Sequence, residues 1–131
     1  FNGNNYKVKN FAVAKGGTAL EPSCAIFNEL GADANIYDVS FENVTFNFVG
    51  LNDKAVVHEK FKAKVAALAV SITEGAKVSN VSVTGTINVD AVYTGELPHL
   101  NDAFWYEGEE NAAIAANITG FTATVTVNKQ S

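Results

Sequence analysis

The residues best suited to recognising a ligand lie together in residues 91–111, AVYTGELPHLNDAFWYEGEEN. This stretch mixes aromatic rings with carboxylates, which suits a sugar because its C–H groups stack on rings and its hydroxyls donate hydrogen bonds to carboxylates. The residues that we expect to bind such a ligand are Tyr93, Asp102, Phe104, Trp105, Tyr106 and Glu107. The alternative is that the aromatic residues cover the side or end of the fold and the acids keep it in solution.

Catalytic chemistry finds little support in the sequence. A glycosidase or lyase needs two carboxyl groups about 5 to 10 Å apart in a groove, and Asp102 with Glu107 is the one pair that we consider suitable. No arginine is present to clamp an acidic sugar. Cys24 is the only cysteine, and we expect it to be a buried apolar residue because no base that would activate a thiol accompanies it. We therefore expect the chain not to be an enzyme.

Metal-binding patterns are also weak. His58 and His99 stand alone, without a second histidine at i+4 or a cysteine pair to complete a zinc site. Carboxylates suited to calcium occur at Asp102, Glu107, Glu109 and Glu110, but the spaced D-x-D-x-D-G pattern is missing. The prediction is therefore no cofactor, with calcium in residues 91–111 as the alternative.

Composition restricts the class of partner. The 131 residues carry a net charge of -5, and all nine basic residues are lysines. Nucleic-acid binding requires a basic face, usually with arginines, so we expect no nucleic-acid partner. The sequence has no run of about 18 apolar residues, so we expect no membrane insertion. The chain begins at Phe1 and contains no methionine, which indicates a processed product or a fragment of a longer protein.

Short alternating runs of Val, Ile, Thr, Phe and Tyr, broken by Gly and Asn, predict β-strands. Four runs share one pattern, namely VKNFAV, IYDVSF, VSNVSV and ITGFTA. Their third positions are Asn10, Asp38, Asn80 and Gly120. Asn, Asp and Gly tolerate left-handed backbone angles, so we expect each to form a structural corner. Such a corner bends the strand and lets the apolar residues on both sides of it face the core.

Repeats that bury one face only by stacking on a neighbour build a solenoid. We therefore expect one all-β domain over residues 1–131, a right-handed parallel β-solenoid (β-helix) of about three coils with loop insertions at 51–64 and 91–111. One inward ladder is expected to contain Val8, Ile36, Val78 and Ile118, and the next Phe11, Val39, Val81 and Phe121. The alternative is an antiparallel β-sandwich, which the same alternation permits but which leaves the recurring corner unexplained.

The repeats resemble those of a known family. FNGNNYKVKNFAV resembles the F-D-G-N-G-Y-x-I-x-N-L-x-I opening of bacterial surface β-solenoids with GLUG-type repeats, and CAIFNELGADANIYDVSFENVTF resembles the coil that follows it. AALAVSITEGAKVSNVSVTGTI resembles the motif itself, G-x-L-A-G-x-x-x-G-A-x-I-x-N-V-x-V-x-G-x-I. The chain departs from the pattern where Ala25, Asn28, Ala66 and Val70 replace motif glycines, and the last copy, residues 111–127, is shorter.

The resemblance implies a non-catalytic structural or adhesive module of a secreted or cell-surface bacterial protein. The partners that it implies are a host or microbial glycan or a surface protein, outside the cell. Two alternatives stay open. One is a carbohydrate-binding module that uses the aromatic and acidic residues 91–111, and the other is a non-catalytic segment of a surface peptidase or polysaccharide-degrading enzyme.

Overall fold

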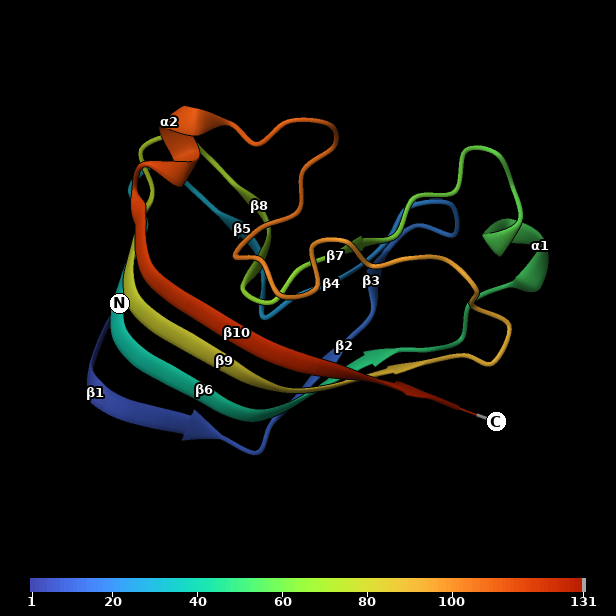
Figure 1. Ribbon diagram of the computed structural model, residues 1–131, viewed down its shortest axis with the longest axis horizontal. Coiled ribbons are helices and arrows are strands. Elements are labelled where there is room, and N and C mark those ends of the chain that lie inside the picture. Colours follow the sequence, from blue (N-terminus) through green and yellow to red (C-terminus); the bar gives the residue numbers. More distant parts are fainter. Residues whose placement is uncertain (131) are drawn as a thin grey trace.

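The computed structural model describes residues 1–130 and is built mainly of β-strands (Figure 1), which confirms the all-β prediction. The strands are β1 (Asn2–Lys9), β2 (Ala12–Ala14), β3 (Gly16–Gly17), β4 (Pro22–Cys24), β5 (Phe27–Leu30), β6 (Asn35–Phe48), β7 (Lys64–Val65), β8 (Ala69–Ile72), β9 (Lys77–Val89) and β10 (Ile118–Lys129). The helices α1 (Asp53–Val56) and α2 (Ala112–Ala115) are single turns, each capped by an asparagine side chain that accepts backbone hydrogen bonds. Neither helix in this described part has the length or apolar character needed to cross a membrane.

The long strands form one parallel sheet. Its order is β1-β6-β9-β10, and β2 continues the pairing of β1 along β6. Figure 1 shows these strands side by side as a curved sheet, with β10 at one edge and β1 at the other. Within residues 1–130 the antiparallel pairing is confined to the short strands β3 and β4. The pairing therefore differs from that of an antiparallel β-sandwich.

The shorter strands also pair in parallel, β4 with β7 and β5 with β8. The loop after β9 adds a further layer to them. The N–H of Ala69 donates to the carbonyl of Ala103 at 2.9 Å, and Ala69 also forms a parallel bridge with Phe104. The segments that follow β1, β6 and β9 are thus also joined by parallel pairing or backbone hydrogen bonds.

The inner face of the large sheet carries columns of apolar side chains. Ile36 pairs with Val78, which in turn pairs with Ile118 on β10. In the same way Val39, Val81 and Phe121 are paired, so these parts of the two expected ladders are confirmed. Further along, Phe46 and Ile87 pair and are fully buried. Burial of each large side chain contributes about 1.5–3 kcal/mol, so the columns are a main source of stability.

The first strand does not follow the predicted ladders. Val8 pairs with Phe41 rather than Ile36, and the carbonyl of Phe11 accepts from the N–H of Thr45. The prediction that Val8 and Phe11 extend these two columns was therefore wrong. The physical reason is a second left-handed corner at Asn43, which lies beside Asn10 and resembles the first corner in sequence.

All four expected corner residues have left-handed backbones. Their φ angles are 60°, 56°, 51° and 64° at Asn10, Asp38, Asn80 and Gly120. Neighbouring corners are also bonded through their side chains, since the Asn80 amide donates to the Asp38 carboxylate at 2.9 Å. The Asn43 amide donates in the same way to the side chain of Asn10 at 2.7 Å. The corners therefore stack as the strands do.

Candidate functional site

Residues 91–111 lie beside β8, to which Ala103 and Phe104 are joined, and part of this loop belongs to the core. Tyr93 and Phe104 are buried, with 6% and 5% of their surfaces exposed. The Tyr93 ring packs edge-on against Phe48 at a centroid distance of 5.9 Å, and its hydroxyl donates to the carbonyl of Glu96 at 2.9 Å. Burial raises the pKa of Tyr93. Tyr93, one of the expected ligand-binding residues, is therefore part of the packing.

Trp105 and Glu107 contact two lysines of the protein surface. The backbone N–H of Trp105 donates to the carbonyl of Val70 at 3.3 Å. The ammonium of Lys64 lies 5.1 Å from the centroid of the Trp105 ring, a cation–π contact that occupies one face of the indole. Glu107 forms an ion pair with Lys62 at 2.8 Å. Both side chains thus already have protein partners.

The lysines that contact Trp105 and Glu107 belong to a small network of surface ion pairs. A hydrogen bond from Lys62 to Glu107, followed by the charge of Glu107, raises the pKa of Lys62. Lys64 bonds to Glu21 at 2.9 Å and lowers the pKa of that carboxyl group. Exposed pairs of this kind are screened by solvent and add little to the stability of the fold.

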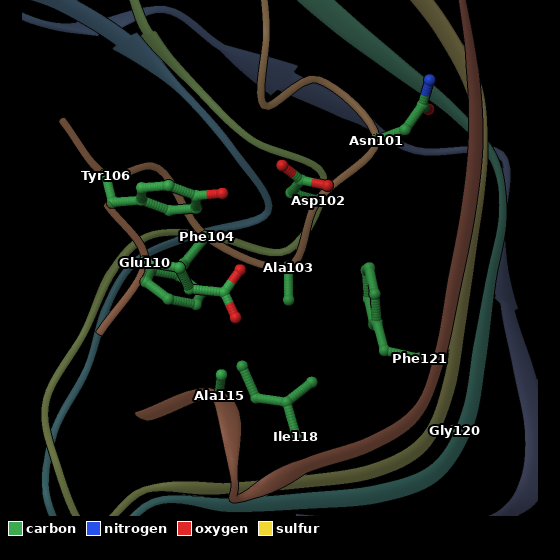
Figure 2. A pocket seen from close by; sticks show the side chains of 10 residues that line it. All are labelled: Asn101, Asp102, Ala103, Phe104, Tyr106, Glu110, Ala115, Ile118, Gly120 and Phe121. Atoms are coloured by element: carbon green, nitrogen blue, oxygen red, sulfur yellow. The ribbon is translucent and has the colours of Figure 1, made fainter. Parts of the chain in front are cut away.

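A cleft of about 280 Å³ opens between this loop, α2 and β10 (Figure 2). Three of the expected residues line it, namely Asp102, Phe104 and Tyr106. The other lining residues are Asn101, Ala103, Glu110, Ala115, Ile118, Gly120 and Phe121. Tyr93, Trp105 and Glu107 are not among them. The structure thus brings together half of the expected site and completes it with other residues.

The polar groups of the cleft are arranged around Tyr106. The His99 ring packs against Tyr106 at a centroid distance of 4.1 Å and a tilt of 44°, and its Nδ1 lies 2.9 Å from the Asp102 carboxylate. Burial, then the charges of Glu110 and Asp102, raise the pKa of Tyr106. Both carboxylates line the same cleft as Tyr106.

Seven lining residues were not among the expected ligand-binding residues, and Glu110, Phe121 and Asn101 show why. Glu110 lies in the same acidic run as Glu107, but composition alone does not say which acid faces the cleft. Phe121 was expected in an inner column, and it lines the cleft because β10 is the last strand of the sheet. Asn101 gave no signal in the sequence. Its side-chain oxygen accepts the N–H of Val125 at 2.7 Å, which fastens the loop to β10.

Other chemistry-bearing residues lie apart from the cleft. Cys24 is buried with 2% of its surface exposed, and burial raises the pKa of its thiol to about 12. A thiol in this state is a poor nucleophile at neutral pH. Across residues 1–130, no three histidine, cysteine or acidic side chains are grouped closely enough to hold a metal ion. Asp102 and Glu110 line the cleft, whereas Glu107 pairs with Lys62.

Comparison with known proteins gives no relative from which to transfer a function. The chain matches no family model, no curated protein and no solved structure. Any functional conclusion therefore depends on the fold and the cleft themselves.

Proposed function

We propose that the chain is a right-handed parallel β-solenoid of about three coils, and that it serves as a non-catalytic structural or adhesive module of a secreted or cell-surface bacterial protein. One observation carries this proposal. Three long strands, β6, β9 and β10, pair in parallel with matching apolar columns although about 40 residues separate them in sequence. A chain that repeats one coil and stacks it in register extends along one axis. Such a shape suits a spacer or stalk.

The side chains that fill and border the coils support a structural role. A column of asparagines also runs along the outer side of the sheet. The Asn88 amide donates to Asn47 at 3.1 Å, and the Asn128 amide donates to Asn88 at 2.9 Å. The loop that carries most of the chemistry-bearing residues places Tyr93 and Phe104 in the core. Two of the four aromatic rings of the loop are therefore engaged in packing.

A spacer must hold its two ends at a fixed separation, and this can be measured. We would fuse one compact fluorescent domain to each end of the chain and record single-molecule energy transfer. The proposal predicts one narrow distribution of transfer efficiency. The control replaces residues 1–131 by a Gly-Ser linker of the same length, which behaves as a flexible coil and gives a broad distribution. A distribution for the native chain as broad as that of the linker would contradict the structural role.

A second candidate function, carbohydrate binding, is favoured by the cleft. Asp102, Tyr106 and Glu110 place two carboxylates and a phenol beside the rings of Phe104 and Phe121. Aromatic faces with adjacent hydrogen-bond acceptors are the usual means of binding sugars. The test is a glycan array probed with the native chain, Tyr106→Ala and Trp105→Ala. We expect binding that Tyr106→Ala abolishes and Trp105→Ala retains, and the reverse order would show that the cleft is not the site.

A further inference from the structure

Within the carbohydrate-binding candidate, on which this inference rests, we propose that the cleft selects a protonated amino sugar over neutral sugars. The ligand would be a hexosamine unit with a free amino group, as in a glucosamine oligomer. Its ring would lie between Tyr106 and Phe121, and its ammonium would face Asp102 and Glu110. Two features of the cleft favour such a ligand, its charge and the placement of its rings.

The charge of the cleft is negative and uncompensated by lysine. Of its ten lining residues, Asp102 and Glu110 are acidic, and none is a lysine or arginine. The nearby lysines point elsewhere, since Lys62 is paired with Glu107 and Lys64 with Glu21. His99 contacts Asp102 and is the one adjacent group that can carry a positive charge. A ligand that brings its own positive charge is therefore matched to the cleft.

The aromatic rings of the cleft are placed so that they can contact the flat apolar face of a sugar ring. Figure 2 shows Tyr106, from the loop, and Phe121, from β10, on opposite sides of the cleft, with Phe104 beside Tyr106. Ala115 and Ile118 close one end of the space. A pyranose ring presents C–H groups on its faces, and these pack on aromatic rings. A linear amine lacks such faces, so the rings favour a sugar over a simple polyamine.

Discrimination against neutral sugars follows from the two carboxylates. A carboxylate that loses water without gaining a strong partner destabilises the complex. The hydroxyls of a neutral sugar give only neutral hydrogen bonds, whereas an ammonium donates three charge-assisted ones. We therefore expect a glucosamine trimer to bind about tenfold or more tightly than the N-acetylated trimer, in which the same nitrogen is an uncharged amide.

The test is isothermal titration calorimetry of the whole chain with four probes, namely the glucosamine trimer, its N-acetylated form, a glucose trimer and spermidine. Asp102→Asn and Glu110→Gln remove one charge each with little change of shape, and each should weaken binding of the glucosamine trimer about tenfold. Glu109→Gln is the matched control, because Glu109 lies in the same acidic run but does not line the cleft. It should leave the affinity unchanged.

The outcomes separate this inference from the proposals that precede it. Equal affinity for the glucosamine and N-acetylated trimers would overturn the selection of amino sugars but keep carbohydrate binding. Spermidine binding as tight as the glucosamine trimer would also overturn it, because charge alone would then suffice. Binding of no probe by folded protein would overturn both this inference and the carbohydrate candidate, and would leave the structural role untouched. Because Glu110 is exposed, Glu110→Gln keeps the test valid even if Asp102→Asn disturbs the contact with His99.

Discussion

The side-chain oxygen of Asn101 accepts the backbone N–H of Val125 at 2.7 Å, and this contact joins the loop 91–111 to the last strand of the sheet. Within residues 1–130, β10 pairs with β9 on one side only, so a backbone N–H that is buried on its other side needs an acceptor from elsewhere. Asn101 supplies one for Val125. Val125 is 5% exposed although it lies on an edge strand. The loop is therefore part of the closure of the fold at β10, as well as one wall of the cleft.

Replacement of Asn101 by alanine should loosen this closure. The N–H of Val125 loses its acceptor, so we expect Asn101→Ala to lower the free energy of unfolding by about 1–2 kcal/mol. The Val125 amide should also exchange its hydrogen faster, as measured by NMR. Asn28→Ala, at an exposed position on β5, serves as the control and should change neither quantity. Unchanged exchange at Val125 in Asn101→Ala would show that the contact does not hold the loop.

Gly85 on β9 is predicted to be irreplaceable for steric reasons. A Cβ at this position would lie 2.0 Å from the carbonyl oxygen of Val44 on β6. We expect Gly85→Ala to lower the free energy of unfolding by about 3 kcal/mol, since neighbouring strands must separate to make room. Gly31→Ala is the matched control, because nothing lies within 4 Å of its added Cβ. Guanidinium denaturation should give equal midpoints for Gly31→Ala and the native chain, and a much lower one for Gly85→Ala.

The corner at Asn80 gives a prediction about backbone conformation. Its φ of 51° disfavours a β-branched residue, so Asn80→Val should lower the free energy of unfolding by about 2 kcal/mol or more. Asn80→Gly loses the side-chain bond to Asp38 but adopts this φ without strain, so it should be much less damaging. Thermal unfolding of both variants checks the order. Equal losses would mean that the hydrogen bond, and not the backbone angle, determines the effect.

The buried thiol of Cys24 gives a prediction about pH. Its pKa is raised from 9.0 to about 12, so the folded state keeps the proton that the unfolded chain loses above pH 9. The stability that this difference provides is fully present below pH 9 and is lost as the pH rises towards 12. The free energy of unfolding should therefore fall less steeply over this interval in Cys24→Ala than in the native chain. Native Cys24 should also resist alkylation at pH 8, and rapid alkylation without unfolding would contradict its burial.

The sequence was sufficient to predict how the residues of β6, β9 and β10 pair, but not how those of β1 pair. The alternation of Val, Ile and Thr and the position of Asp38, Asn80 and Gly120 led to the correct pairing of β6, β9 and β10. The same pattern at Asn10 led to the wrong partner for Val8, which pairs with Phe41 and not with Ile36. In the structure, Asn4 and Asn5 carry the positive φ angles next to the residues that pair with Tyr37 and Val39. A pattern of six residues cannot distinguish two corners that lie on one strand.

The candidate site was predicted less well, because a loop has no periodicity from which to infer direction. Asp102, Phe104 and Tyr106 line one cleft, whereas Tyr93 lies in the core and Trp105 beside Lys64. Which of several neighbouring rings faces inward depends on long-range contacts, such as the bridge between Ala69 and Phe104. Such contacts join residues that are far apart in the sequence, so a local pattern does not predict them.

The central claim is that the chain stacks an interchangeable coil, and duplication of one coil tests it most directly. Asn35 pairs with Lys77 and Ile36 with Val78, so a second copy of residues 36–77 inserted after Lys77 continues every column in register. Because each coil is stabilised by its neighbours, the melting temperature should rise, by about 5 °C or more, with an unchanged β-sheet circular dichroism spectrum. A Gly-Ser insert of equal length at the same point should lower it. A duplicated chain that melts below the native one, or fails to fold, would contradict the stacked-coil account.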